Sequence, residues 1–532
     1  MDRRRFLGGL ALAGVTVACA NEDGTARGDG DGATTTRAAV VAAQPAGGDL
    51  PDGVFSLGVA SGDPLPGAVM LWTRLAADPL AADGGAPSGE VEVAYDVATD
   101  DTFSELVASG VAVARPELGH SLHVDVTGLE PDTWYVYRFR AGGRTSPVGR
   151  TRTFPEPSAA PESLRFVFAS CQDYQWGYYG AWGRVAEEPD LDVVVFLGDY
   201  IYELNLGDLS PQKDGARVWA GPEPETVADY RRRYAQTKSD PQLQAAHEVA
   251  PWIVTWDDHE VSNNYAGDVA QEDVETPASR DRRLAAYQAW YEHTPVRVDP
   301  EPQDFDRLQV HREFSYGELA SFFVIETRQH ADVPACRTDG TLVADEGPSC
   351  DALEVEERSN LGAEQEAWLI DGLSTSSTTW NILANPIMLA GLNVGTADEP
   401  EITRDAWDGY PATRRRLLEA ITASEVPNPV VVTGDWHASF VLDVASNPDG
   451  PTVMPEFLAS SISTVLFDTD YRPENPHVRY FVAEHGYALV TVTPDDLRCD
   501  FRYIEDVWDP DTAVSHTDSW VLAEGEHEPS PV

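Results

Sequence analysis

An apolar run that ends abruptly at a carboxylate constrains the fold of this chain most strongly. Residues 193–197 read Val-Val-Val-Phe-Leu and lead through Gly198 to Asp199, with Tyr202 three residues further on. A continuous apolar run of this length is typical of a parallel strand that is buried on both faces, and the glycine permits a sharp turn after it. The carboxylate and the phenol oxygen then point to the same end of the strand. This stretch alone leaves one alternative open, a loop aspartate that caps the next helix.

Three further apolar runs end in side chains of the same chemical kind. They finish at Cys171, at Asp257-Asp258-His259-Glu260 and at Asp435-Trp436-His437. Open α/β sheets place their sites at the carboxyl ends of strands, so we expect these side chains to converge. Carboxylates and phenolate are hard oxygen donors that suit Fe(III), Ca²⁺ or Mn²⁺, and the single thiolate indicates a mixed site. Asp199 lies centrally, and a carboxylate can bridge two ions about 3.5–4 Å apart, so the pattern predicts a two-metal site.

Length and composition predict two domains. The chain has 532 residues, too many for one ordinary core, and 42% of them are apolar. Residues 51–155 alternate apolar and polar side chains between frequent turns, which indicates an antiparallel β-sandwich. Residues 163–508 alternate apolar runs with amphipathic helical stretches, as in an α/β domain. Pro155, Pro157 and Pro161 stiffen the short linker between the two.

One motif specifies the kind of sandwich in the first domain. Residues 129–135 read Leu-Glu-Pro-Asp-Thr-Trp-Tyr. This order resembles the signature of fibronectin type III modules, in which the tyrosine packs against backbone a few residues upstream. We therefore expect a fibronectin- or immunoglobulin-like sandwich.

The two ends of the chain are expected to lie outside these domains. Residues 1–19 combine Arg3-Arg4-Arg5 with an apolar segment too short for a permanent membrane span, and match a twin-arginine export signal. The sequence thus predicts transfer to the twin-arginine machinery and a periplasmic, cell-surface or extracellular location. Cys19 ends an imperfect lipoprotein cleavage box, which leaves a lipid anchor open. We expect a flexible linker over 20–50 and an acidic extension on the surface over 509–532.

Charge and cysteine usage exclude some functions. The chain has 37 basic and 89 acidic residues, a net charge of −52, which repels nucleic acid and anionic membrane surfaces. Adaptation to salt and a generic acidic secreted protein both remain open. Cys336 and Cys350 flank a polar loop that a local disulfide could close in an oxidising compartment. Cys499 is expected to be a small buried apolar side chain.

Seven short motifs are spread over residues 53–505. They are Ser61-Gly62-Asp63-Pro64, Leu71-Trp72-Thr73-Arg74, Ser170-Cys171-Gln172, Gly198-Asp199-Tyr200-Ile201-Tyr202-Glu203, Trp256-Asp257-Asp258-His259-Glu260, Asp405-Ala406-Trp407-Asp408-Gly409-Tyr410 and Gly434-Asp435-Trp436-His437. Together they resemble PhoD-type alkaline phosphatases and phosphodiesterases, calcineurin-like metallophosphoesterases related to the purple acid phosphatases. The resemblance implies an α/β/β/α sandwich after the all-β domain. It also implies release of phosphate from small-molecule phosphomonoesters, with phosphodiesters as a further substrate class.

The same resemblance implies a ligand set for each metal. For Fe³⁺ the set is Cys171, Asp199, Tyr202 and His437, and for Ca²⁺ it is Asp199, Asp258, Asp435 and Asn385. The implied reaction is attack on phosphorus by a metal-bound hydroxide or oxo group. Two alternatives remain: a dedicated phosphodiesterase for teichoic acid or phospholipid headgroups, and a non-catalytic binding protein of the cell surface. We expect a monomer.

Two further side chains are expected to act on the substrate. His259 protonates the leaving alkoxide or orients the phosphate, and the alternative is a supporting histidine bonded to Glu260. Arg328 contacts the phosphate, and the alternative is a surface salt bridge. Glu326 stands where the family usually has Asp, which alters the support around Arg328.

Three other positions complete the expectations. Ile201 provides no basic contact inside its motif, so phosphate recognition depends more heavily on the metals. His477 and His485 both precede predicted strands, and we expect them to be structural.

Overall fold

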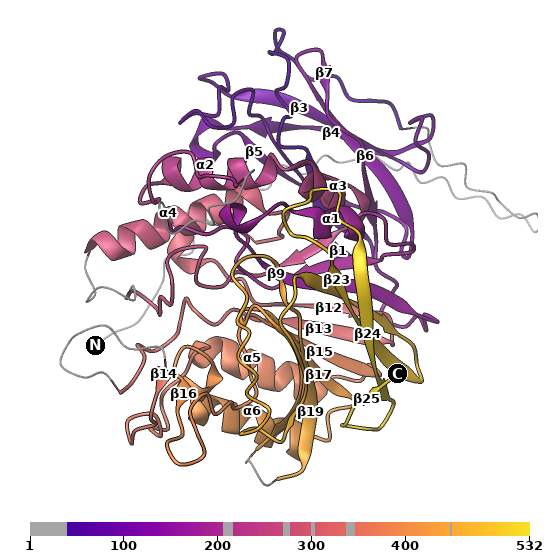
Figure 1. Cartoon of the computed structure of the whole chain (residues 1–532). Coiled ribbons are helices and arrows are strands. Elements are labelled where there is room, and N and C mark those ends of the chain that lie inside the picture. Colours follow the sequence, from indigo (N-terminus) through magenta and orange to yellow (C-terminus); the bar gives the residue numbers. More distant parts are fainter. Residues whose placement is uncertain are drawn as a thin grey trace, which may run out of the picture. The chain divides into compact units, whose positions relative to one another are not determined.

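Two β-sheets packed face to face, with helices on their outer sides, form the α/β part of the molecule (Figure 1). The computed structural model describes residues 40–205, 216–269, 277–298, 300, 304–336, 346–446 and 450–532. The predicted export signal over 1–19, including Cys19, lies outside these residues. In the part of the chain that is described, no helix is both long and apolar enough to cross a membrane.

The larger sheet is mixed and contains the strand with which the sequence argument began. Its order is β25-β24-β23-β22-β9-β10-β11-β1-β2-β5, and β20 pairs with β9 outside this path. The strands are β1 (Val59–Leu65), β2 (Ala68–Arg74), β5 (Ser121–Thr127), β9 (Leu164–Gln172), β10 (Val193–Phe196), β11 (Trp252–Val254), β20 (Ser461–Ser463), β22 (Gly486–Val492), β23 (Asp496–Ile504), β24 (Val514–Ala523) and β25 (Ser530–Pro531). β9, β10 and β11 are parallel neighbours, so their carboxyl ends lie at one edge.

The smaller sheet has the order β12-β13-β15-β17-β19-β18-β21. Its strands are β12 (Arg312–Tyr316), β13 (Ala320–Val324), β15 (Trp380–Asn385), β17 (Pro429–Thr433), β18 (Ser439–Ala445), β19 (Thr452–Leu458) and β21 (Val478–Val482). Val195 belongs to the apolar core between the two sheets, whereas Val194 and Phe196 belong to the core under the helices. β10 is therefore buried on both faces, which explains why its sequence is continuously apolar.

Helices cover the outer face of each sheet. α1 (Gly180–Val185), α2 (Val227–Lys238), α3 (Pro241–Val249) and α4 (Pro277–His293) pack on the larger sheet, and α5 (Gly362–Thr375) and α6 (Pro411–Ala423) on the smaller one. α2 begins at a capping box in which Thr226 and Asp229 exchange side-chain-to-backbone hydrogen bonds. The layers are thus helix, sheet, sheet and helix, and the prediction of an α/β/β/α sandwich is confirmed.

The N-terminal domain is the expected β-sandwich. Its own sheet has the order β4-β3-β6-β7, with β8 paired to β6. These strands are β3 (Val91–Ala98), β4 (Leu106–Ala114), β6 (Trp134–Ala141), β7 (Arg144–Thr145) and β8 (Gly149–Arg152); the short pair β14 (Glu346–Gly347) and β16 (Ile402–Thr403) lies elsewhere. The hydroxyl of Tyr135 accepts from the backbone N–H of Glu130 (2.9 Å), so the predicted tyrosine corner is confirmed.

The second face of this sandwich is made by β1, β2 and β5, which belong to the larger sheet. β1 joins β11 in parallel through the pair Gly62 and Trp252. A Cβ atom at Gly62 would lie 2.5 Å from the carbonyl oxygen of Trp252, so this close approach requires glycine. Next to it, Arg312 donates two hydrogen bonds to the buried Asp63 (both 2.9 Å). The sandwich and the α/β domain therefore share one sheet.

Two segments that were expected to lie outside the domains pack onto them. Within the predicted flexible linker 20–50, residues 40–50 run along the sandwich. The backbone N–H of Ala43 donates to Ser109 Oγ (2.8 Å), and Leu50 is buried. The prediction of flexibility is wrong for these residues, because backbone hydrogen bonds to the sandwich hold a segment that has few large apolar side chains. Within the predicted extension 509–532, β24 and β25 continue the larger sheet, so this segment is part of the α/β domain.

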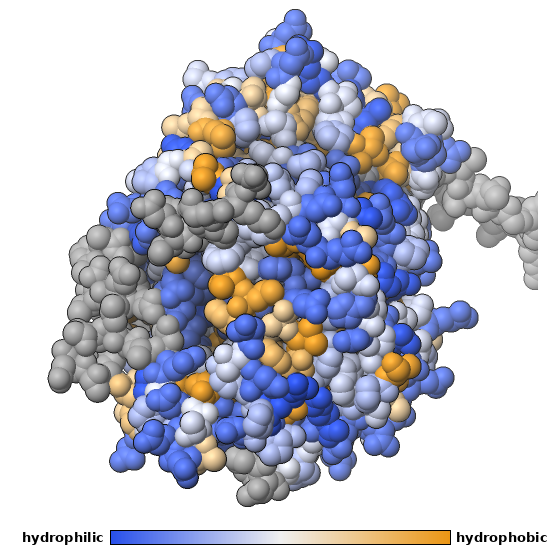
Figure 2. Space-filling model, in the orientation of Figure 1, coloured by the Kyte–Doolittle hydropathy of each residue, from blue (hydrophilic) through white to orange (hydrophobic). Residues whose placement is uncertain are grey.

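Several smaller predictions can be compared directly. Cys336 and Cys350 form a disulfide, and Cys499 is buried in the core between the sheets. His477 and His485 each bond to a backbone carbonyl, of Gly391 and Thr464 respectively (both 2.7 Å), as structural histidines do. Figure 2 shows hydrophilic side chains over most of one face and apolar ones gathered near its middle.

Candidate metal centre

The side chains singled out by the sequence lie where strands of the two sheets end. Cys171 is the next-to-last residue of β9, and Asp199 and Asp258 follow β10 and β11. Asp435 and His437 follow β17 in the smaller sheet. The two sheets pack face to face, so their carboxyl ends bring these five side chains together.

The backbone of these strand ends is unusual. Cys171, Asp199, Asp435 and His437 have φ values of 58°, 59°, 69° and 53°, in the left-handed region that residues with a side chain seldom adopt. Gly198 has a φ of 112°, and a Cβ atom there would lie 2.5 Å from the Cβ of Asp257. Strained residues of this kind collect at functional sites, where the surrounding structure holds them in place.

Asp199 is the centre of the arrangement. Its Oδ2 accepts from the hydroxyl of Tyr202 (2.9 Å) and from the thiol of Cys171 (3.5 Å). Its Oδ1 accepts from the backbone N–H of His259 (3.3 Å). The Tyr202 oxygen also lies 3.2 Å from Nε2 of His437. Both oxygens of this one carboxylate thus face other candidate ligands.

Three groups of side chains have donor atoms close enough to hold a metal ion. In each group the donor atoms lie within 4.8 Å of one another, and the groups are Cys171, Asp199 and His437; Asp199, Asp258 and His259; and Asp257, Asp258 and Asp435. The first two groups share Asp199, and the last two share Asp258. The arrangement therefore suits adjacent cations joined by a common carboxylate.

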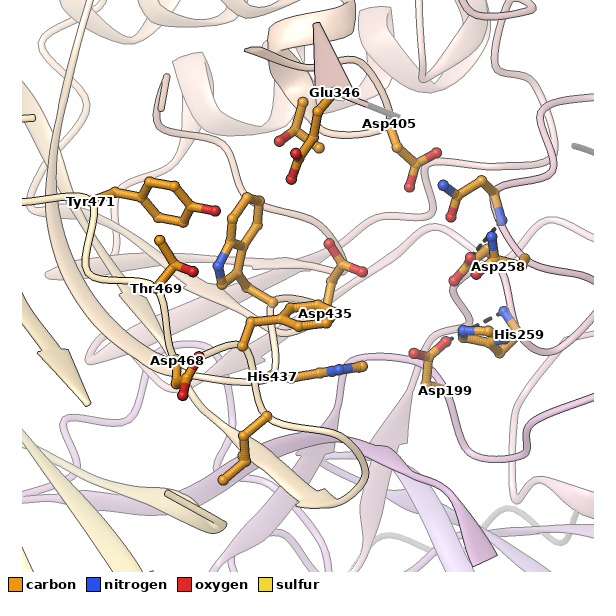
Figure 3. A pocket seen from close by; sticks show the side chains of 16 residues that line it. Asp199, Asp258, His259, Glu346, Asp405, Asp435, His437, Asp468, Thr469 and Tyr471 are labelled. Carbon is orange, nitrogen blue, oxygen red and sulfur yellow. Dashed lines mark hydrogen bonds between the residues drawn. The ribbon is translucent and has the colours of Figure 1, made fainter. Parts of the chain in front are cut away.

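Five side chains of these groups line a pocket of about 340 Å³: Asp199, Asp258, His259, Asp435 and His437. Figure 3 shows Asp199, Asp258 and His259 on one side, with Asp435 and His437 facing them. Among the described residues that line the pocket, six are acidic and none is lysine or arginine.

Comparison with known proteins identifies the family and supports the fold. The model of the PhoD-like phosphatase family matches residues 166–501, and that of the N-terminal domain of PhoD-like phosphatases matches residues 41–155. The chain belongs to the PhoD-like phosphatase family. It is 44% identical over 477 residues to "Alkaline phosphatase D" of Bacillus subtilis (strain 168), covering 88% of this chain and 80% of that protein.

A solved structure described as "Structure of PhoD" superposes with a TM-score of 0.86 at 41% identity, and covers 91% of this chain and 93% of that one. Family membership, a close relative and a matching structure agree along nearly the whole chain. This PhoD-like phosphatase is a phosphoric ester hydrolase.

In this PhoD-like phosphatase the candidate ligands are buried acidic groups that repel one another when they are ionised. Burial raises the pKa of Asp199, Asp435, Cys171 and Tyr202 well above their ordinary values. Neighbouring acids raise these pKa values further, as Asp199 does for both Cys171 and Tyr202. So many acidic groups cannot lose their protons together in a dry site unless positive charge enters it.

His259 is held by a carboxylate that the sequence did not identify as its partner. Its Nδ1–H donates to Oε2 of the buried Glu203 (2.7 Å), whose Oε1 accepts from the backbone N–H of Asn263 (2.5 Å). Glu260, the predicted alternative partner, instead accepts from the backbone N–H groups of Asp199 (3.0 Å) and Asp257 (2.8 Å). The His259–Glu260 interpretation is therefore wrong, and Glu203 fixes the imidazole beside Asp199 and Asp258.

Arg328 does not line the pocket and is not at the surface. Its buried guanidinium donates to Asp257 (2.5 Å) and Asp405 (2.6 Å), and lies 3.8 Å from Asp258. Neither the predicted phosphate contact nor the alternative surface salt bridge describes it. Arg328 instead positions carboxylates at the edge of the site, including the candidate ligand Asp258.

Glu326 supports this arginine, as its unusual identity suggested. Its Oε2 accepts from the backbone N–H groups of Arg328 (2.9 Å) and Gln329 (2.7 Å). The indole of Trp256 also donates to it (3.2 Å). The longer side chain thus organises the turn that carries Arg328.

Asn385 is not brought together with the other predicted ligands. Its Oδ1 accepts from the indole of Trp407 (3.1 Å), and its amide nitrogen donates to the carbonyl of Ile387. Asn385 is not among the side chains that line the pocket. Both polar ends of the amide are thus engaged inside the protein, which speaks against a role as a calcium ligand.

Sequence reasoning missed three carboxylates of the site, Glu203, Asp257 and Asp405. Each stands inside a motif already singled out, directly beside a candidate ligand or at the start of the motif. Adjacent acids after a buried strand were the available signal. Which of them bonds to histidine or arginine depends on loop conformation, which the pattern does not contain.

Proposed function

We propose that this PhoD-like phosphatase is exported, needs Fe³⁺ and Ca²⁺, and hydrolyses small-molecule phosphomonoesters. One observation carries the metal requirement: Asp199 is shared between two groups of buried donor atoms, with neither lysine nor arginine among the described residues that line the pocket. A doubly charged phosphate is repelled by such a pocket until cations enter it.

The donor set fits these two metals. Cys171, Asp199, Tyr202 and His437 combine thiolate, carboxylate, phenolate and imidazole, a mixed set that suits ferric iron. Asp258 has donor atoms close to those of Asp199 in one group and to those of Asp435 in another, and these three side chains offer carboxylate oxygens alone, which suits calcium. When bound, the cations neutralise phosphate oxygens and activate water for attack on phosphorus.

The remaining residues hold and orient these groups. Glu203 accepts from Nδ1–H of His259 and so fixes the orientation of the ring toward the pocket. The other ring nitrogen, Nε2, is then free to give a proton to the leaving alkoxide. Arg328 donates to Asp405 and lies 3.8 Å from Asp258, and its positive charge helps to hold both carboxylates in place.

Export is the part of the proposal that rests on sequence alone. Arg3-Arg4-Arg5 and the apolar segment after them match a twin-arginine signal. The disulfide between Cys336 and Cys350 supports an oxidising destination, the periplasm, the cell surface or the medium.

Hydrolysis of p-nitrophenyl phosphate by purified protein, with and without iron and calcium, tests this function. We expect activity only when both metals are supplied. Folded protein that binds both metals and releases no phosphate would refute the proposal. Parallel assays with bis-p-nitrophenyl phosphate determine whether diesters are hydrolysed as well.

A further inference from the structure

The pocket extends past the metal donors to an outer end with a different lining. In Figure 3, Asp199 and Asp258 lie on one side, and Thr469 and Tyr471 lie on the other, with Asp435 between them and Glu346 near the top of the view. The alcohol portion of a phosphate held at the inner donors can therefore extend along the pocket toward this outer end.

The outer end keeps negative charge that the protein does not neutralise. Glu346 and Asp468 both line the pocket and are exposed, and neither has an ion-pair partner within the described ranges. Asp405 differs, because Arg328 donates to it (2.6 Å). Tyr471 lines the same pocket, and beyond the effect of burial the charge of Glu346 raises its pKa.

Aromatic side chains stand beside these carboxylates. Trp436, Phe467 and Tyr471 all line the pocket. Trp436 is only 7% exposed, and its indole N–H has no hydrogen-bond partner in the described part of the chain. A buried donor of this kind requires an oxygen acceptor, which an ester in the pocket supplies. Aromatic faces next to carboxylates favour a cation such as an alkylammonium group.

We propose that the outer end of the pocket selects phosphate esters whose alcohol carries a positive charge. The inference rests on the proposed function, since the inner donors must hold the phosphate. Trp436 then donates to an oxygen of the ester, while Glu346 and Asp468 attract the cation beside the rings of Phe467 and Tyr471. Polyanionic esters are disfavoured by the same carboxylates.

A matched pair of substrates tests this selection. Phosphocholine and 3,3-dimethylbutyl phosphate have nearly the same shape and differ in the positive charge. We expect kcat/KM to favour phosphocholine by about fivefold or more, the effect of exposed carboxylates and one aromatic cation contact. The double variant Glu346→Gln, Asp468→Asn should bring the ratio close to one. Glu419→Gln, an exposed acid on α6, is the matched control and should leave the ratio unchanged.

Dihexanoylphosphatidylcholine and its 3,3-dimethylbutyl analogue distinguish a lipid headgroup from a free ester. Selectivity in the monoester pair alone assigns the site to free esters, and selectivity in both pairs extends it to headgroups; either result supports the proposal. A ratio near one in both pairs, or a ratio that the double variant does not alter, overturns it. If p-nitrophenyl phosphate is still hydrolysed in that case, the proposed function stands and only the proposed selectivity fails. If no ester is hydrolysed, the proposed function and the proposed selectivity both fail.

Discussion

Two buried aspartates, Asp96 in the β-sandwich and Asp199 at the metal centre, have pKa values shifted in opposite directions. Burial alone would raise the pKa of Asp96, but hydrogen bonds from Arg140, Ser109 and Arg138 lower it below the ordinary value. Arg140 and Arg138 lie 2.8 Å and 3.1 Å from its carboxylate. Burial raises the pKa of Asp199 well above the ordinary value, and the charge of His259 opposes this only in part.

The difference separates a structural carboxylate from a functional one. This chain can neutralise a buried aspartate with arginine, and it does so at Asp96. At Asp199 it places a thiol, a phenol and further carboxylates instead. Asp257 is an intermediate case, because Arg328 neutralises a carboxylate that borders the centre. A buried carboxylate that no arginine or lysine neutralises therefore indicates a site that takes positive charge from outside.

Replacing Asp199 should greatly reduce activity, whereas replacing Asp96 should leave activity nearly unchanged. Asp199→Ala removes the shared ligand, so we expect kcat/KM to fall by about a thousandfold or more, since metal charge stabilises the transition state by several kcal/mol. Asp96→Asn should retain kcat/KM within about twofold, as it touches no substrate group. Both constants are measured with p-nitrophenyl phosphate. Near-native turnover by Asp199→Ala would contradict the distinction between Asp199 as a functional carboxylate and Asp96 as a structural one.

Removing Arg328, the partner of the intermediate case Asp257, should mainly reduce the stability of the protein. Arg328→Met leaves the buried carboxylate of Asp257 without the guanidinium that donates to it, and we expect a loss of about 3–5 kcal/mol in the free energy of unfolding. Urea denaturation in the presence of a chelator measures this loss without a contribution from metal binding. The control Arg415→Met breaks an exposed ion pair with Glu356 and should cost less than about 1 kcal/mol. Equal losses for the two variants would contradict the structural role of Arg328.

His259 and Glu203 form a neutralised pair inside the centre. We expect His259→Asn to lower kcat by about a hundredfold with an alkyl phosphate, whose alkoxide needs a proton to leave. The loss should be much smaller with p-nitrophenyl phosphate, whose leaving group is stable as an anion. Glu203→Gln should also reduce kcat more with the alkyl phosphate than with p-nitrophenyl phosphate. Both reductions should be smaller than those of His259→Asn, because Glu203 only positions the ring. Equal losses on both substrates would show that His259 is not the proton donor.

Asp96→Asn should destabilise the protein in a pH-dependent way. The folded-state pKa of Asp96 is lowered, so its contribution to stability is complete above the unfolded pKa of about 3.9 and is lost as the pH falls through the folded value. At pH 7 we expect the variant to lose about 1–3 kcal/mol, because two arginines lose a charged partner. Guanidinium denaturation at pH 7 and pH 3 measures both differences. A difference that grows toward pH 3 would have the wrong sign.

The smallest effect should come from exchanging one anionic ligand for another. Cys171→Asp keeps a negative donor at the end of β9, and a carboxylate is also a hard ligand for ferric iron. We expect the variant to retain iron and to lose less than about tenfold in kcat/KM. Iron analysis of the purified variant measures retention. Complete loss of iron would show that the thiolate itself is required.

Sequence patterns predicted the strands and the residues at their ends, because buried strands and their polar ends differ sharply in hydrophobicity. They did not predict that β1 joins β11, since the contact depends on one pair, Gly62 and Trp252. They also misassigned Asn385, whose oxygen is taken by Trp407, 22 residues away in the chain. Partners such as these depend on loop conformation and tertiary packing, neither of which leaves a periodic signal.

The metal content of the purified, folded protein tests the central claim most directly. If Asp199 has no arginine or lysine partner because metals supply the charge, elemental analysis should find about one iron and about one calcium ion per chain. Chelation should abolish hydrolysis, and returning both metals should restore it. Folded protein that hydrolyses phosphate esters while holding neither metal would contradict the account.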